Sequence, residues 1–216
     1  MSNIRLRYQT IEFGDIDIHL CTLRDKQQFD DPNGVAEALG IAPALWPIFG
    51  VVWPSSVALA NFMDDYNTGN KRILEVGCGM ALPSLLLNSK SADITSTDCH
   101  PEAGTFLARN TAINNSADIA FERTGWADNN DKLGLFDLII GSDLLYEDEH
   151  IELLAGFIAA HSKAVCEVIL VDPGRGRKTK LVNALERSGF VCSYQRVPQH
   201  ADPALNYKGH ILKFVR

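Results

Sequence analysis

An apolar strand that closes on two glycines constrains the fold of this chain more than any other feature. Residues 71–76 carry Ile, Leu and Val, which is typical of a buried parallel strand. The chain then turns through Gly77 and Gly79 and continues as an apolar stretch at 82–87, which predicts a helix with Pro83 in its first turn. A strand that ends in Gly-x-Gly and leads into a helix lets the backbone approach a ligand and directs N–H groups towards it. The pattern therefore predicts a nucleotide-type binding turn.

Composition indicates a single globular domain. The 216 residues are 46% apolar and 22% charged, which is enough for one core of ordinary size. We predict one domain over residues 1–216, with an N-terminal hairpin and loop extension at 1–48 and a cofactor-binding core at 49–216. A net charge of −7 argues against broad binding of nucleic acid, although residues 175–178 form a local basic patch.

The sequence predicts neither a membrane segment nor a metal site. No apolar run reaches the ~18–20 residues that a membrane helix needs, and residues 1–5 lack the layout of a signal peptide. The five cysteines stand at irregular spacing without a C-x-x-C motif. Because this usage is typical of reduced thiols rather than of disulfides or zinc ligands, we expect a cytoplasmic protein without a bound metal.

Hydrophobic patterns predict an α/β chain that begins with a hairpin. Residues 4–23 form two alternating strands around a tight turn at Gly14, and we expect this hairpin to decorate an edge of the core. Residues 24–45 have no assignable role, and Ser55 or Ser56 is expected to cap a helix that runs to about residue 66. Beyond the glycine turn, strands are predicted at 93–98, 119–122, 138–140, 165–172, 190–197 and 210–215, and helices at 101–114, 149–160 and 178–188.

Acidic and aromatic residues follow several of these strands. Asp98 ends the second core strand, 21 positions after Gly77, where a carboxylate can accept both ribose hydroxyls of an adenosine. A solvated loop carboxylate is the alternative for Asp98. Trp126, after the third strand, could stack on an adenine, and a plain core role is its alternative. Ser142 and Asp143 follow the fourth strand and are expected to face the ligand crevice of an open α/β sheet.

These residues together resemble a known family. Glu75-x-Gly77-x-Gly79 resembles motif I of class I S-adenosylmethionine-dependent methyltransferases, whose Rossmann-like fold inserts an antiparallel seventh strand between the fifth and sixth strands. Residues 50–56 resemble the G-x-x-W-P segment of the methyltransferase-16 family of protein lysine methyltransferases, and residues 142–146 match its Asp-x-x-Tyr motif. The resemblance implies a seven-stranded, mostly parallel sheet with helices on both faces.

The resemblance also implies roles for individual residues. Those expected to contact S-adenosylmethionine are Trp53, Gly77, Cys78, Gly79, Asp98, Trp126 and Ser142, with Glu75 supporting the turn from below. Asp143 and Tyr146 are the expected catalytic residues, at the mouth where the acceptor amine enters. Ala81 replaces the third glycine of the turn, which requires a negative φ at that position. Residues 171–175 resemble a loop of the branch that methylates lysines of electron-transfer flavoprotein β.

The implied function is an S-adenosylmethionine-dependent N-methyltransferase that acts on a lysine of a protein substrate. The lysine must lose its proton, and its free pKa is ~10.4, so an apolar channel would favour the reactive form. Asp143 would hold the ammonium and Tyr146 would orient the amine. A small-molecule methyltransferase and a non-catalytic cofactor-binding scaffold remain as alternatives. A nicotinamide oxidoreductase is less favoured, because it would carry the third glycine.

Overall fold

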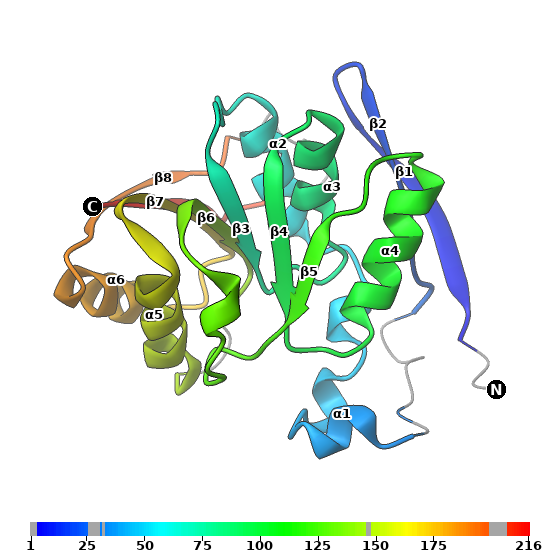
Figure 1. The fold of residues 1–216 in the computed structure, drawn as a ribbon, viewed down its shortest axis with the longest axis horizontal. Helices are drawn as coiled ribbons and strands as arrows, with labels where there is room; N and C mark the ends of the chain where they lie inside the picture. The colour runs from blue at the N-terminus through cyan, green and yellow to red at the C-terminus, as the bar shows by residue number, and fades with distance from the viewer. Residues whose placement is uncertain (1–3, 26–30, 32, 146–147, 199–206) are drawn as a thin grey trace.

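The computed structural model describes residues 4–25, 31, 33–145, 148–198 and 207–216. Within these ranges a seven-stranded sheet with the order β5-β4-β3-β6-β7-β9-β8 forms the centre of the molecule (Figure 1). Its strands are β3 (Arg72–Val76), β4 (Asp93–Asp98), β5 (Ala120–Arg123), β6 (Phe136–Ser142), β7 (Ser162–Asp172), β8 (Val191–Arg196) and β9 (His210–Val215).

The direction of the strands confirms the predicted topology. Strands β5, β4, β3, β6 and β7 run parallel to their neighbours, whereas β9 is antiparallel to both β7 and β8. In core numbering, β9 is the seventh strand, and it lies between the fifth and the sixth. Parallel neighbours bring their carboxyl ends to one edge of the sheet, so the loops after β3, β4, β5, β6 and β7 meet there.

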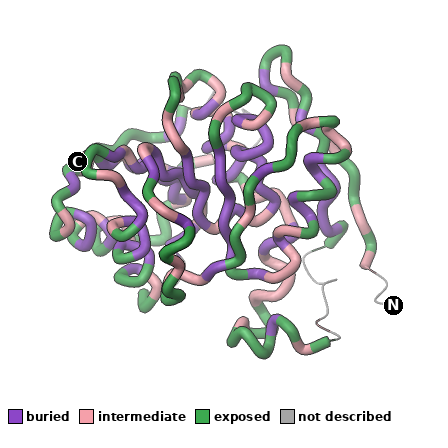
Figure 2. The backbone as a smooth tube through the Cα atoms, in the orientation of Figure 1, coloured by how far each residue is buried: buried purple, intermediate pink, exposed green. Residues whose placement is uncertain are grey.

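Alternating side chains bury both faces of the sheet under helices. On one face Ile73, Leu138 and Ile169 pack with α2 (Pro54–Asp64), α3 (Leu82–Ser89) and α4 (Ala103–Ile113). On the other face Leu74 and Ile139 pack with α5 (His150–His161) and α6 (Lys178–Arg187). Successive strand residues point to opposite faces, which explains why β3 and β6 are largely apolar and mostly buried (Figure 2).

The N-terminal hairpin packs on helices and does not extend the main sheet. Strands β1 (Leu6–Phe13) and β2 (Ile16–Leu23) pair in register around Gly14, whose φ of 55° suits the tight turn. Strand β2 lies against α3 and α4 (Figure 1). Asn110 of α4 accepts a hydrogen bond from the backbone N–H of Cys21 at 2.8 Å. The hairpin is therefore a separate two-stranded sheet outside the main sheet, and the apolar face of β2 is buried under the helices.

The segment between the hairpin and β3 contains α1 (Val35–Ala38), η1 (Pro43–Leu45), η2 (Ile48–Gly50) and α2. Helix α2 begins at Pro54, with Trp53 as its N-cap residue and without a side-chain cap. The predicted capping by Ser55 or Ser56 was wrong, because Pro54 already occupies the first helical turn, where its missing N–H costs nothing. The hydroxyl of Ser55 instead bonds the Tyr207 hydroxyl at 2.7 Å.

The expectation that no segment is long and apolar enough to cross a membrane is corrected at residues 43–64. The helical residues Pro43–Asp64 are long and apolar enough, by length and composition alone, to cross a membrane, which the sequence pattern did not predict. The structure divides this segment into η1, η2 and α2, and α2 packs against α3, β6 and β7. Such a pattern is also that of a core helix in a soluble protein, so it is weak evidence for a membrane span.

Candidate active site

The glycine turn after β3 has the conformation that its sequence predicts. Gly77 and Gly79 adopt φ values of 59° and 52°, in the left-handed region that glycine enters without strain. A Cβ atom at Gly79 would lie 3.1 Å from the backbone oxygen of Phe49, so η2 approaches the turn too closely for a side chain. The backbone N–H of Cys78 donates to Thr97 O at 2.9 Å and fixes the turn to β4.

Ala81 departs from the expectation for the turn. Its φ is 55°, in the left-handed region, whereas the sequence argument required a negative value for an alanine there. This conformation costs an alanine about 1–2 kcal/mol. It is held by the Ala81 N–H bond to Cys78 O at 2.7 Å and by the start of α3, whose first turn includes Pro83. The surrounding turn and helix therefore determine this conformation, and the side chain does not.

Glu75, two residues before the turn, is buried between β3 and α3. Its side chain is 1% exposed and faces α3, where its Oε2 accepts hydrogen bonds from the N–H of Ser84 at 3.1 Å and from the Ser84 hydroxyl. Burial raises the pKa of Glu75 to about 8, against the lowering effect of these two bonds. The carboxyl thus fastens the start of α3 to the end of β3.

Asp98 is directed at the glycine turn from the neighbouring strand. Its Oδ2 accepts the N–H of Gly79 at 2.8 Å, and its Oδ1 accepts the N–H of His100 at 2.8 Å. Burial raises the pKa of this carboxyl, which is 8% exposed, while the backbone bonds lower it. The His100 ring in turn stacks on Phe49, with centroids 3.9 Å apart. Hydrogen bonds from Cys99 lower the pKa of Asp98 as well, so its two oxygens hold the start of the loop after β4 against the glycine turn.

Trp126 reaches the glycine turn from the loop after β5. Its Cζ2 atom is 3.9 Å from the position that a Cβ of Gly77 would take, and its ring meets the His150 ring edge-on at 5.8 Å. Trp53 is the residue before α2, and its indole N–H donates to Ile48 O at 2.9 Å. The structure thus brings Trp126 to the turn and places Trp53 at the start of α2, next to η2.

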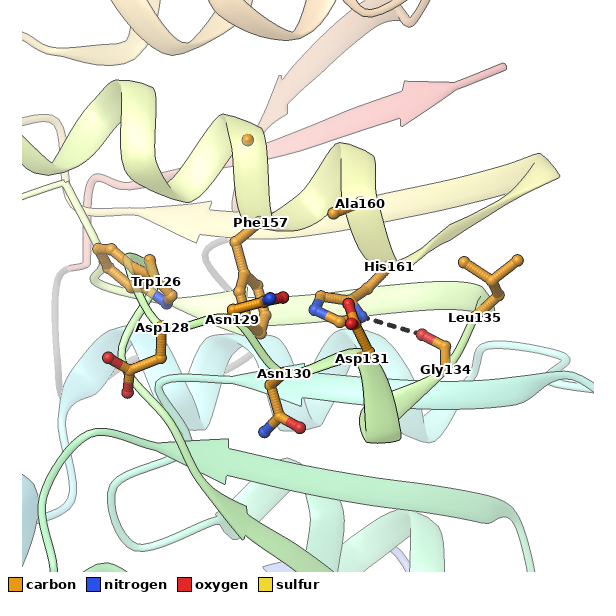
Figure 3. Close-up of a pocket in the computed structure, with 11 residues that line it drawn as sticks. Trp126, Asp128, Asn129, Asn130, Asp131, Gly134, Leu135, Phe157, Ala160 and His161 are labelled. Carbon is orange, nitrogen blue, oxygen red and sulfur yellow. Dashed lines mark hydrogen bonds between the residues drawn. The ribbon is translucent and has the colours of Figure 1, made fainter.

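A hollow of about 370 Å³ lies beside Trp126, between the loop after β5 and helix α5 (Figure 3). Trp126 stands at one end, Asn130 and Phe157 line the middle, and His161 lies at the other end with its Nδ1 2.9 Å from Gly134 O. The residues that line it include none of Gly77, Asp98 or Asp143. The hollow therefore adjoins the predicted site through Trp126 but does not contain it.

Asp143 is already paired with a cation. It follows Ser142 at the end of β6, has a φ of 56°, and its N–H donates to Val171 O at 2.9 Å. Its Oδ1 accepts Nε and Nη2 of Arg175 at 3.0 and 2.8 Å. The sequence pattern did not predict this partner. Tyr146, the other predicted catalytic residue, lies outside the described residues.

Two further polar residues stand at the same edge and were not assigned to the site from sequence. Asp172 ends β7 and is 2% exposed. Tyr207 is bonded to Ser55, and burial, with the nearby charges of Asp143 and Asp172, raises its pKa to about 12. The position of Asp172 at a strand's carboxyl end is the same signal that identified Asp98, and it could have been used. Tyr207 carried no such signal, because only the fold brings it to α2.

The strand order, the glycine turn and the acid after the next strand together define a class I methyltransferase fold. Residues 46–183 match the model of a lysine methyltransferase family, and the chain belongs to that family.

Curated relatives match over shorter stretches. The chain is 32% identical over 108 residues to the histone-arginine methyltransferase METTL23 of Xenopus laevis, covering 47% of this chain and 46% of the relative. It is 30% identical over 110 residues to the protein N-lysine methyltransferase METTL21A of Danio rerio, covering 47% and 50%. The chain thus spans about half the length of the curated relatives it matches.

Solved structures share the fold at low identity. The ribosomal protein L11 methylase of Lactobacillus delbrueckii subsp. bulgaricus has a TM-score of 0.59 and 23% identity over 73% of this chain and 77% of its own. The Thermus thermophilus 16S rRNA N2 G1207 methyltransferase, solved with AdoMet and guanosine, has a TM-score of 0.64 and 12% identity over 98% and 50%. Because their acceptors differ, these structures support the architecture alone.

Proposed function

We propose that this protein transfers a methyl group from S-adenosylmethionine to a lysine side chain of a protein substrate. The observation that carries the proposal is the match to the lysine methyltransferase family over residues 46–183. The geometry supports it, because Gly77, Gly79, Asp98 and Trp126 lie together at the carboxyl edge of the sheet. The predicted motif residues Ser142 and Asp143 stand at the same edge.

The residues at the turn fit an adenosyl group. Gly77 and Gly79 form a turn without side chains, the Asp98 carboxylate lies against that turn, and Trp126 places an aromatic ring beside it. When bound, S-adenosylmethionine supplies a methyl group that its sulfonium already activates. The chain's own task is then to hold an amine in line with that group and in its neutral form. Carboxylates beside the entrance would receive the amine as an ammonium ion.

Calorimetric titration with S-adenosylmethionine and S-adenosylhomocysteine, with NADH as control, tests the cofactor. We expect micromolar binding of the adenosyl ligands alone. Asp98→Asn should weaken that binding by roughly 10- to 100-fold, because it replaces an acceptor of a charged hydrogen bond. Asp93→Asn, at the exposed start of the same strand, is the matched control and should bind as the unaltered protein does. Binding of NADH alone would contradict the proposal.

The acceptor is tested by transfer of a labelled methyl group into a lysate from a strain without this gene. We expect label in the protein fraction and methyllysine after hydrolysis. One relative is a histone-arginine methyltransferase, so methylarginine is the outcome that would move the acceptor to arginine. Label confined to small molecules would contradict a protein substrate.

The five cysteines are free, and we also propose a cytoplasmic location, which cell fractionation tests.

A further inference from the structure

Two carboxylates and one guanidinium gather at the carboxyl ends of β6 and β7. Asp143 and Asp172 lie side by side, because the Asp143 N–H bonds the carbonyl of Val171, the residue before Asp172. Arg175 binds Asp143 through two nitrogens. With both acids ionised, the cluster carries one negative charge that Arg175 does not neutralise. One more positive charge would therefore balance the charge of this cluster.

Asp172, the second carboxylate, is buried, and one of its two oxygens accepts a hydrogen bond from the described part of the chain. Asp172 is 2% exposed, and its Oδ2 accepts the N–H of Gly174 at 3.0 Å. Its Oδ1 is buried and has no hydrogen-bond partner within the described part of the chain. His210 faces Asp172 across the β7–β9 pairing, and Tyr207 lies near enough for its pKa to be raised by the Asp172 charge. Neither side chain bonds the free oxygen.

A buried carboxylate oxygen without a donor is costly unless a ligand satisfies it. Burial raises the pKa of Asp172, and the charge of Asp143 raises it further, against the lowering effect of the Gly174 bond and of the nearby His210 and Arg175 charges, so the ionised form is less stable here than in water. An ammonium ion would supply both a positive charge and a hydrogen-bond donor. Asp143 has less need of one, because its Oδ1 already accepts two nitrogens of Arg175.

We propose that Oδ1 of Asp172 binds the ammonium group of the incoming acceptor, with Asp143 and Arg175 as a fixed ion pair beside it. This assignment rests on the proposed function, since it names the amine-binding atom of the same site. It transfers to Asp172 the role that the sequence pattern suggested for Asp143. Asp172 is thereby a residue that positions the amine, and Arg175 keeps Asp143 from competing for it.

The variant Asp172→Asn distinguishes the negative charge of Asp172 from its hydrogen bond to the turn at Gly174. The asparagine oxygen can still accept the Gly174 N–H and preserve the turn, while the negative charge is lost. Propylammonium, which mimics the end of a lysine side chain, is titrated into protein saturated with S-adenosylhomocysteine, with 1-propanol as the neutral control. We expect the Asn variant to bind propylammonium roughly 10- to 100-fold more weakly, since hydrogen bonds to charged groups are strong. Its affinity for S-adenosylhomocysteine should stay within about twofold.

Glu152→Gln provides the matched control, because Glu152 is an exposed carboxylate paired with Arg187 at 2.7 Å, away from this cluster. This variant should bind propylammonium as the unaltered protein does. Transfer of labelled methyl into protein should fall with Asp172→Asn and recover in part with Asp172→Glu. Should the Asn variant fail to fold, the carboxyl carbon-13 resonance of Asp172 in the unaltered protein must shift with propylammonium and not with propanol.

The outcomes separate the two proposals. Unchanged propylammonium binding by Asp172→Asn, or loss of binding only in Asp143→Asn, would overturn the assignment and leave the methyltransferase proposal standing. An absent carbon-13 shift would also overturn it. Failure of the unaltered protein to bind S-adenosylhomocysteine would instead remove the proposed function, and this inference with it.

Discussion

At the scale of single residues, the environment of a side chain decides its chemistry. Glu75 and Asp143 are both acids near the ends of neighbouring strands, β3 and β6. Glu75 is buried against α3 and accepts hydrogen bonds from Ser84, whereas Asp143 is paired with Arg175. The sequence motif identified both acids. It did not predict that burial would raise the pKa of Glu75 to about 8, because that depends on which helix covers the strand.

The titration of Glu75 should appear in the stability of the protein. A carboxyl whose pKa is raised on folding binds its proton more tightly in the folded state, so stability is lost as pH rises from about 4.5 to about 8. Glu75→Gln removes this loss. The free energy of unfolding of the variant, relative to the unaltered protein, should therefore increase by a few kcal/mol across that range in urea titrations. A difference between Glu75→Gln and the unaltered protein that stays flat with pH would refute the prediction.

Gly141 is a second residue whose surroundings set its role. A Cβ there would lie 2.8 Å from Leu144 Cδ1 and 3.0 Å from both Cγ2 and O of Val76, so Gly141→Ala overpacks the contact between β6 and β3. We expect a loss of about 1–3 kcal/mol in unfolding free energy. Gly156→Ala in α5 meets nothing within 4 Å and should stabilise by about 0.5–1 kcal/mol. The same sign for both alanines would contradict this account.

At the scale of elements, the two loops at the mouth are joined by ion pairs. Arg175 binds Asp143, while Arg177 and Lys180 bind Asp148 at 2.7 and 2.5 Å. The pairs to Asp148 are exposed and contribute little stability. Together with the Arg175–Asp143 pair, they join the loop after β7 and the start of α6 to the first residue of the predicted Asp-x-x-Tyr motif and to Asp148 beyond it. The basic patch at 175–178 therefore has intramolecular partners.

Two amides bond the hairpin to α4: Asn114, at the end of the helix, bonds the N–H and the carbonyl of His19, and the buried Asn110 bonds Cys21. Asn110 is 0% exposed and accepts the N–H of Cys21, so Asn110→Ala leaves that N–H buried without a partner. We expect a loss of about 1–3 kcal/mol and faster hydrogen exchange across β2. Asn61→Ala removes only a bond within α2, from Asn61 Nδ2 to Val57 O, and should cost less. Equal losses of unfolding free energy in the two variants would contradict the prediction that the bond from α4 to the hairpin contributes more stability than the bond within α2.

At the scale of the whole molecule, the antiparallel strand β9 joins β7 to the edge strand β8 of the main sheet. Phe214 is fully buried on the face covered by α5 and α6, and Val215, the next residue, is 43% exposed. Phe214→Ala should lower the unfolding free energy by about 3–5 kcal/mol through the cavity it leaves. Val215→Ala on the same strand should change it by less than about 1 kcal/mol. Denaturant titration of the two variants decides, and comparable losses would contradict the placement of the core.

The sequence by itself determined the elements and the class of fold, because local features specify them. Apolar runs, the two glycines and the acids after strands depend on neighbours a few residues away. The antiparallel seventh strand between the fifth and the sixth, which the family resemblance implied, was confirmed. Only the tertiary structure decided the hairpin's position, the start of α2 at Pro54 and the positive φ of Ala81. It also decided the pairing of Asp143 with Arg175 and the burial of Asp172 beside Tyr207. These outcomes arise from contacts between residues far apart in the chain, whose partners no local pattern specifies.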